Sequence, residues 1–245
     1  MPIDRHAGNP VRATVVSADT MLRAIKALGI VPFFSNPIRG YSIEELTPPE
    51  FWFDGDSDTL GPWDWKVDCV QSGDIAYGKF LWGGKAAFAT PALYRELMNY
   101  RRSLPKYAPD ADGQRVLCAL KESGTLASRD IRRMLGVKKA AADNVATRLQ
   151  MQCRLVIGDI TRVYRGPDLH YSGWQLASFC DPEALFGGNT ASDGKGILGP
   201  GGFPFVDDDA AAPDHTPEES YLILSDHIRS IAPAATDRLI AKMLG

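Results

Sequence analysis

Apolar side chains recur at helical spacing in several stretches of the chain. In the first of them they fall at Met21, Leu22, Ile25 and Leu28, and Gly29 follows as a helix stop. Thr90 followed by Pro91 is typical of a helix start. Outside the central part of the chain, this pattern predicts helices over residues 17–28, about 90–102, 217–230 and 233–244.

Shorter apolar runs bounded by turn residues are typical of strands. The turns contain Gly73 and the pair Gly83-Gly84, and a short strand or buried turn is expected from Ile30 to Phe34. Together these runs predict an N-terminal α+β module with a small antiparallel sheet, residues 1–106. The predicted strands of that sheet are residues 65–70, 75–81 and 85–89.

The order of elements between residues 107 and 186 is that of a winged helix-turn-helix. Three helices are expected, the first ended by Gly124 and the second by Gly136, and a two-stranded wing follows with its turn at Gly166. A tighter hairpin at Gly158-Asp159 stays open as an alternative. The predicted helices cover 114–123, 129–135 and about 138–152, and the predicted strands cover 125–126, 155–164 and 171–179.

The last part of the chain divides into a low-complexity segment and a helical tail. Residues 187–216 hold the run Asp207-Asp208-Asp209 and many glycines, which predicts a flexible strap. Residues 217–245 are expected to form two short helices. The overall expectation is an α+β protein with a winged helix between an N-terminal α/β module and a C-terminal helical tail.

Charge is unevenly distributed along the 245 residues, although the net charge is only −3. Residues 113–166 hold eleven Lys and Arg against four Asp and Glu, a surplus of seven positive charges. Residues 181–245 hold four basic and eleven acidic side chains, a surplus of seven negative charges. A basic module favours a polyanion as partner. The acidic strap suggests an autoinhibitor of that module as a further hypothesis.

Duplex DNA is therefore the expected partner, through the third helix and the wing of the winged helix. This prediction depends on the cations of the module lying exposed on one surface. A winged helix that binds only another protein is the alternative. The candidate DNA-binding residues are Lys138, Lys139, Asn144, Thr147, Arg148, Arg162, Arg165 and His170, with Lys79, Lys85, Arg101 and Arg102 as an extension onto the first module.

No other constellation predicts a metal, a cofactor or a membrane segment. Asp54, Asp56 and Asp58 alternate as in a calcium loop, but no Glu stands at the twelfth position. The four cysteines and four histidines are scattered, which favours reduced thiols and a cytoplasmic location, and no apolar run is long enough to span a membrane. The five tryptophans could stack an unpaired base but are more typical of a core.

Several short runs in the chain are characteristic of one family. They are Gly29-Ile30-Val31-Pro32-Phe33-Phe34, Trp63-Asp64-Trp65-Lys66, Tyr77-Gly78-Lys79-Phe80, Gly84-Lys85-Ala86, Asn99-Tyr100-Arg101-Arg102 and Leu185-Phe186-Gly187. With these runs the chain resembles the AlkZ-related proteins, which stand near the winged-helix DNA glycosylases of the AlkZ/YcaQ type. The resemblance implies tandem winged helices that form a positively charged cradle for duplex DNA, in a family whose enzymes remove alkylated or crosslinked bases.

The chain departs from the pattern of those enzymes at both catalytic runs. Their Gln-apolar-(Gln/Asp) motif falls at Val31-Pro32-Phe33-Phe34 here, and their Glu-Tyr-Trp-x-His-like run falls at residues 79–85, so both places lack an acid, an amide and a histidine. Gln150-Met151-Gln152 has the right letters but is interpreted as helix surface. No catalytic residue is therefore assigned. The expected function is non-catalytic recognition of DNA or of DNA damage, or transcription regulation, with a glycosylase that uses other residues as the alternative.

Overall fold

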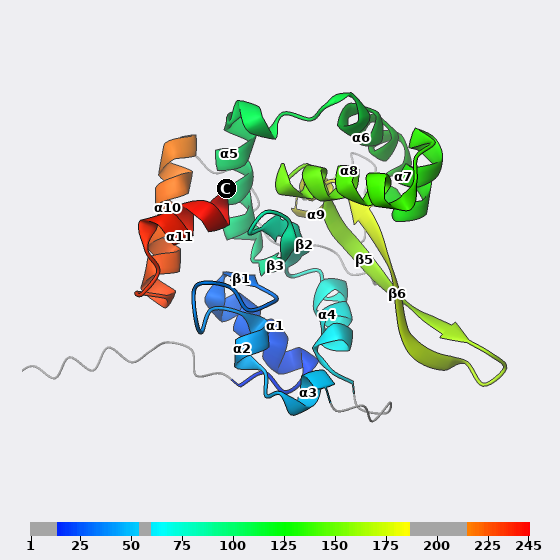
Figure 1. Cartoon of the computed structure of the whole chain (residues 1–245), viewed down its shortest axis with the longest axis horizontal. Coiled ribbons are helices and arrows are strands. Elements are labelled where there is room, and N and C mark those ends of the chain that lie inside the picture. The colour runs from blue at the N-terminus through cyan, green and yellow to red at the C-terminus, as the bar shows by residue number, and fades with distance from the viewer. Residues whose placement is uncertain (1–13, 54–59, 187–214) are drawn as a thin grey trace, which may run out of the picture.

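Within the described residues, six antiparallel strands form one open sheet, and helices pack around it (Figure 1). The computed structural model describes residues 14–53, 60–186 and 215–245. The strands are β1 (Ile30–Pro32), β2 (Ala76–Leu81), β3 (Lys85–Ala89), β4 (Thr125–Ala127), β5 (Val156–Arg165) and β6 (His170–Cys180). Their order in the sheet is β1-β3-β2-β5-β6-β4.

The helices account for most of the remaining described residues. A short 3-10 turn, Pro105–Tyr107, links two of them. The helices are α1 (Ala18–Leu28), α2 (Ile43–Leu46), α3 (Glu50–Phe53), α4 (Pro62–Gln71), α5 (Pro91–Ser103), α6 (Ala111–Ser123), α7 (Ser128–Leu135), α8 (Lys139–Met151), α9 (Pro182–Phe186), α10 (Pro217–Ile231) and α11 (Asp237–Leu244). The fold is thus a mixed arrangement of helices and an antiparallel sheet, as expected. Among the described residues, no helix has the length and apolar character to cross a membrane.

The sheet is continuous across the place where the sequence predicts two modules. Strands β1, β3 and β2 form one half, and strands β5, β6 and β4 form the other. The two halves meet where Tyr77 of β2 pairs with Ile157 of β5. The predicted small sheet and the predicted wing are therefore parts of a single sheet. The boundaries proposed at residues 106 and 186 stay a prediction.

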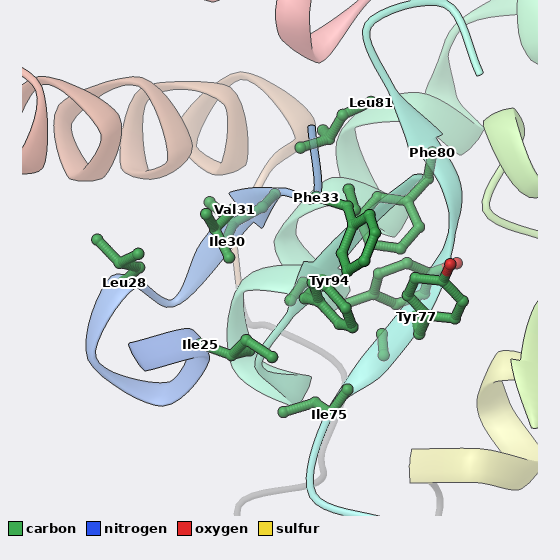
Figure 2. Packing of buried hydrophobic residues seen from close by; sticks show 14 of the residues in the cluster. Ile25, Leu28, Ile30, Val31, Phe33, Ile75, Tyr77, Phe80, Leu81 and Tyr94 are labelled. Carbon is green, nitrogen blue, oxygen red and sulfur yellow. The ribbon is translucent and has the colours of Figure 1, made fainter. Parts of the chain in front are cut away.

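The main core lies between α1, the β1–β3–β2 half of the sheet and α5. Ile25 and Leu28 of α1 belong to this core, and Phe80 of β2 lies edge-on to Tyr94 of α5 with ring centroids 5.0 Å apart (Figure 2). Ser17 caps α1, and Gly29 ends it with a positive φ of 69° that favours glycine. This core holds the first half of the chain together.

A second, smaller core lies beneath α6, α7 and α8. Its members include Val116, Ile131, Val145 and Leu149 from the three helices and Phe179 from β6. The helices begin and end within a few residues of the predicted positions, and Gly124 and Gly136 follow α6 and α7 as expected. The hairpin turn lies at 166–169 between β5 and β6, so the tighter alternative at Gly158-Asp159 is wrong.

The C-terminal helices are an integral part of the main core rather than a tail. Helix α10 packs along α5, and α11 follows against the same side of the molecule (Figure 1). Leu224, Ile228, Met243 and Leu244 are fully buried. Their helical spacing leaves one apolar stripe on each helix, which the main core covers. Most of the predicted strap, residues 187–216, lies outside the described residues, so the hypothesis that it inhibits the basic module stays a prediction.

The predicted strand over residues 65–70 is wrong, because these residues belong to helix α4. Gly61 stands at the N-cap and Pro62 at the first helical position, where its missing N–H is not needed. Trp65, Val67 and Val70 are buried against α1 and β5. The helix is buried on more than one side, so its apolar positions do not show the clean helical period.

Candidate nucleic-acid interface

The start of α8 carries two exposed basic side chains. Lys138 is the N-cap residue and Lys139 is the first residue of α8, and both are exposed, as is Asn144 one turn further on. Neither lysine has an ion-pair partner within the described residues. The partial positive charge of the helix N-terminus adds to that of the two ammonium groups. This end of α8 therefore attracts anions.

The second half of α8 is covered by the first half of the chain. Thr147 is half-buried beside the β2–β3 turn, where a Cβ on Gly84 would lie 2.8 Å from its Cγ2. Arg148 is exposed but pairs with Asp110 at 2.8 Å. Only the first two turns of α8 are thus free to contact a ligand. Thr147 was expected on the exposed face of this helix, but it lies against the β2–β3 turn.

Gln150 and Gln152 are buried, so the interpretation of these residues as helix surface is wrong. The Gln150 Oε1 atom accepts a hydrogen bond of 2.9 Å from the backbone N–H of Lys79, and its Nε2 donates to the carbonyl of Ala146. Gln152 donates to the carbonyl of Ala108. The amide of Gln150 joins α8 to β2, which is a structural role.

Lys79 and Lys85 lie on the β2–β3 hairpin, and both are exposed. The backbone of Lys79 bonds to α8 through Gln150, and the turn before Lys85 touches Thr147. The structure therefore brings these two lysines beside the C-terminal half of α8. They remain candidates for the edge of a basic surface.

Helix α7 carries three arginines that were not among the candidate residues. Arg129, Arg132 and Arg133 are all exposed, because Ile131 faces the second core. Arg133 pairs with Asp130 at 2.6 Å, and Arg129 is 4.0 Å from the same carboxylate. The signal was present as the placement of the arginines around a buried position at helical spacing.

Asp130 belongs to the start of α7 rather than to a free acidic site. It accepts a hydrogen bond from the backbone N–H of Ala127 and closes a capping arrangement. This hydrogen bond, with help from Arg133 and Arg129, lowers the pKa of Asp130. Arg132 has no such carboxylate among the described residues, so it joins Lys138 and Lys139 as an unpaired cation.

The hairpin of β5 and β6 projects from the molecule and carries Arg165 and His170 near its tip (Figure 1). These two residues pair across the strands, and both are exposed. The Arg165 guanidinium lies over the ring of Trp174, 5.4 Å from the centroid. The large apolar side chains exposed on this arm are Tyr164, Leu169, Trp174 and Leu176. Both candidates are therefore free to contact a ligand.

Arg162 lies on β5 of the same hairpin, and its side chain is hydrogen-bonded to helix α4. Its two terminal nitrogens donate to both carboxylate oxygens of Asp68, at 3.0 and 2.9 Å, and one of them also donates to the carbonyl of Asp64. Hydrogen bonding to Asp68 raises the pKa of Arg162. Its side chain is only 19% exposed. Arg162 therefore braces the hairpin, and its placement contradicts a role as a free DNA contact.

The side chains of Arg101 and Arg102 are engaged within the protein, so the prediction that they contact DNA is wrong. Arg101 is fully buried and donates to the carbonyls of Leu244 and Met151, at 2.7 and 2.9 Å, and to that of Phe80. Arg102 binds the carboxylate of Glu183 and the carbonyl of Cys153. The expectation failed because two adjacent arginines on one helix need not both face the solvent. Here the first points into the core.

Ion pairing reduces the free charge of the basic module but does not remove it. Five of its eleven cations pair with aspartates, and six do not appear in any ion pair within the part of the chain that the structure describes. Pairs on an exposed surface contribute little and a phosphate can compete for them. The paired cations are Arg115, Arg129, Arg133, Arg148 and Arg162.

The comparison with known families decides where the chain belongs. The family described as AlkZ related matches residues 15–197. The chain belongs to the AlkZ-related family. Neither the curated proteins nor the solved structures gave a match. Membership relates the chain to the DNA glycosylase-like superfamily.

In this AlkZ-related chain, residues 31–34, where the glycosylase motif was expected, comprise the end of strand β1 and the bend that follows it. Val31 and Phe33 are fully buried, and the ring of Phe33 contacts those of Trp52 and Phe88 at centroid distances of 5.5 and 5.6 Å. Aromatic rings thus pack tightly around Phe33. In the described part of the chain no group of three or more His, Cys, Asp or Glu could hold a metal ion.

Proposed function

We propose that this AlkZ-related chain binds duplex DNA without hydrolysing its glycosidic bonds. Helices α6, α7 and α8 with the β5–β6 hairpin serve as a winged helix, in the order α6–β4–α7–α8–β5–β6 that this motif requires. The first two turns of α8 approach a groove, while the hairpin follows the neighbouring backbone. Damage recognition and transcription control are the two roles that such binding serves.

One observation carries the proposal: the corner where α7 meets α8 presents three exposed cations without a carboxylate partner among the described residues. These are Arg132, Lys138 and Lys139. Phosphate groups favour such a corner because counterions are released and because the helix N-terminus faces them. Arg165 and His170 on the hairpin supply a second contact away from this corner.

The decisive test replaces the two lysines together. The variant Lys138→Glu with Lys139→Glu is expected to bind a duplex at least about tenfold more weakly than the unchanged chain. The logarithm of the affinity falls linearly with the logarithm of the salt concentration, and the slope of this line should become less negative by about two. Each lost phosphate contact contributes about 0.9 to that slope. Both quantities are measured by fluorescence anisotropy between about 50 and 200 mM salt.

A matched control changes the same charge elsewhere. Arg238→Glu with Lys242→Glu alters two exposed cations of α11, a helix that meets α8 at its C-terminal end and not at the start that carries Lys138 and Lys139. This variant should keep most of its affinity and the full salt slope. Equal losses in both double variants would reduce the effect to net charge and contradict the assigned surface. Retention of a purified protein partner with no DNA binding at low salt would favour the protein-interaction alternative.

Two further measurements address catalysis and role. Duplexes that carry alkylated bases should yield no abasic sites above a control without protein, because residues 31–34, where the glycosylase motif was expected, hold no acid and no amide. Base release from any of these duplexes would restore the glycosylase alternative. Tighter binding to alkylated than to undamaged duplex would assign the role to damage recognition, and sequence-dependent binding would assign it to transcription control.

A further inference from the structure

Helix α4 holds a buried lysine that the proposed function does not use. Lys66 is 6% exposed, and it forms no ion pair with any carboxylate in the described part of the chain. Its Nζ donates to the carbonyl of Trp63 at 2.7 Å and to Oε1 of Gln175 at 2.5 Å. It also lies over the ring of Trp63, 4.5 Å from the centroid. A buried ammonium without a counter-ion is rare, because desolvation disfavours the charged form.

The surroundings of Lys66 favour the neutral amine at mildly alkaline pH. Burial lowers the pKa of Lys66 to about 8; Asp64 opposes the shift and Arg162 adds to it. Tyr171 also faces this cluster and donates to Asp64. A neutral amine keeps two N–H groups, which are enough for both oxygen acceptors. Loss of the third proton therefore leaves no acceptor unsatisfied and frees a lone pair.

The buried amine lies beside an aromatic side chain that is exposed to solvent. Trp63 is 49% exposed, and its ring rests against Phe33 and Phe34 with centroid distances of 5.4 and 5.6 Å. An exposed indole offers a flat apolar wall to a sugar or a base. The lysine is thus covered on one side by a ring that can support a ligand.

The same lysine stands at the base of the arm that we place on DNA. Its partner Gln175 belongs to β6, and Arg162 of β5 bonds to the neighbouring Asp68 of α4. Further up the hairpin lie Arg165 and His170. A duplex that follows the hairpin backbone therefore passes close to α4.

We propose that the amine of Lys66 captures the aldehyde of an abasic deoxyribose in DNA as an imine. The inference rests on the proposed DNA binding. The Nζ lone pair adds to C1′ of the open-chain sugar and the carbonyl oxygen takes up a proton. Loss of water from the resulting carbinolamine then forms the carbon–nitrogen double bond. Addition of water reverses both steps, so no oxidant, reductant or cofactor is required. A reaction that removes a damaged base must precede this step, which fits a chain without water-activating groups at the glycosylase position.

The imine is trapped by reduction with cyanoborohydride, which delivers hydride to the imine carbon and leaves a stable secondary amine. The full chain is incubated with a duplex that contains one abasic site, and the products are resolved on a denaturing gel and mapped by peptide mass. We expect a covalent complex at Lys66. A duplex with a tetrahydrofuran in place of the abasic sugar has no aldehyde and should give none.

Two comparisons separate this inference from the proposed function. Anisotropy reports whether the duplex binds at all, and deoxyribose 5-phosphate serves as an aldehyde without a duplex. At equal aldehyde concentration the abasic duplex should modify Lys66 at least tenfold faster than the small sugar. Modification by the small sugar alone would overturn the assignment to DNA. Binding of the duplex without an adduct, or adducts spread over Lys138 and Lys139 instead, would overturn the inference itself.

A variant and a pH profile complete the test. Lys66→Arg keeps the charge and the donors but forms no imine, so trapping should fall at least twentyfold while duplex affinity stays within twofold. Lys121→Arg, at an exposed site on α6, should trap as the unchanged chain does. Trapping by the unchanged chain should reach half its maximum near pH 8, well below the value of an exposed lysine. A midpoint near that of exposed lysines would contradict the site, whether or not Lys66→Arg folds.

Discussion

The buried guanidinium of Arg101 should support the stability of the fold and not its affinity for DNA. It lies where the C-terminal ends of α8 and α11 meet, so the carbonyls of Met151 and Leu244 both point at it. Within the described residues no carboxylate pairs with it. The partial negative charge at two helix ends takes the place of a counter-ion. Removing the side chain therefore leaves carbonyl groups without a donor.

The loss of stability in Arg101→Met can be worked out from the three carbonyl groups that lose their donor. Each buried carbonyl that loses its partner costs about 1–3 kcal/mol. Relief from burying a charge offsets part of the sum, which leaves an expected loss of about 3 kcal/mol in the free energy of unfolding. For a chain of this size the midpoint of thermal unfolding should fall by about 6–12 °C. Urea and thermal unfolding, followed by circular dichroism, measure both.

Arg132→Met is the matched control, because Arg132 is exposed and has no ion-pair partner among the described residues. Its stability should stay within about 0.5 kcal/mol of the unchanged chain. A loss below about 1 kcal/mol in Arg101→Met would refute the reasoning. Duplex affinity of Arg101→Met, measured well below its melting temperature, should change less than twofold. A loss as large as that of the Lys138→Glu, Lys139→Glu variant would return Arg101 to the DNA surface.

Three further predictions concern packing and protonation. Gly84→Ala should cost about 1–3 kcal/mol of stability by unfolding, because Gly84 has a φ of 96° and its new Cβ would press on Thr147, whereas Gly83→Ala meets no atom within 4 Å and should cost less. Gln150→Leu should cost about 1–3 kcal/mol by leaving a β2 amide without an acceptor, and equal stability would contradict the structural role. The folded chain releases the Lys66 proton near pH 8, whereas the unfolded chain releases it near the ordinary lysine pKa. The free energy of unfolding should therefore rise with pH between these two values. The rise should exceed that of the Lys66→Met variant by up to about 3 kcal/mol.

Much of the helical structure could be predicted because its signals are local. Ser17 and Thr90 stand at helix starts in the structure, and Gly124 and Gly136 follow helix ends. Caps and left-handed glycines act within a few residues, so one sequence is enough to find them. The hairpin was equally visible, since its turn residues stand between two long apolar runs.

The elements that were missed depend on distant contacts. Helix α4 is buried against both α1 and β5, so Trp65 to Val70 carry too many apolar residues to show which face is inside. The joining of β2 to β5 through Tyr77 and Ile157 depends on partners 80 residues apart. No local pattern encodes such a pairing.

In the candidate site, too, some placements follow from the local sequence and others depend on distant contacts. The exposed lysines at the start of α8 follow from the amphipathic pattern of that helix. The burial of Arg101 and the pairing of Arg162 do not follow from any local pattern, because acceptors on other elements determine them. These acceptors are the carbonyl of Leu244 for Arg101 and the carboxylate of Asp68 for Arg162. Charge counting gives the number of cations in a segment but not which of them remain free.

The placement of α10 and α11 has a consequence for synthesis on the ribosome. Leu224 and Met243 belong to the same core as Val15, so segments far apart in the sequence share one interior. The nascent chain must therefore hold apolar surface of α5 uncovered until α10 and α11 have been synthesised. We expect a stalled chain without these two helices to engage chaperones and to be sensitive to protease.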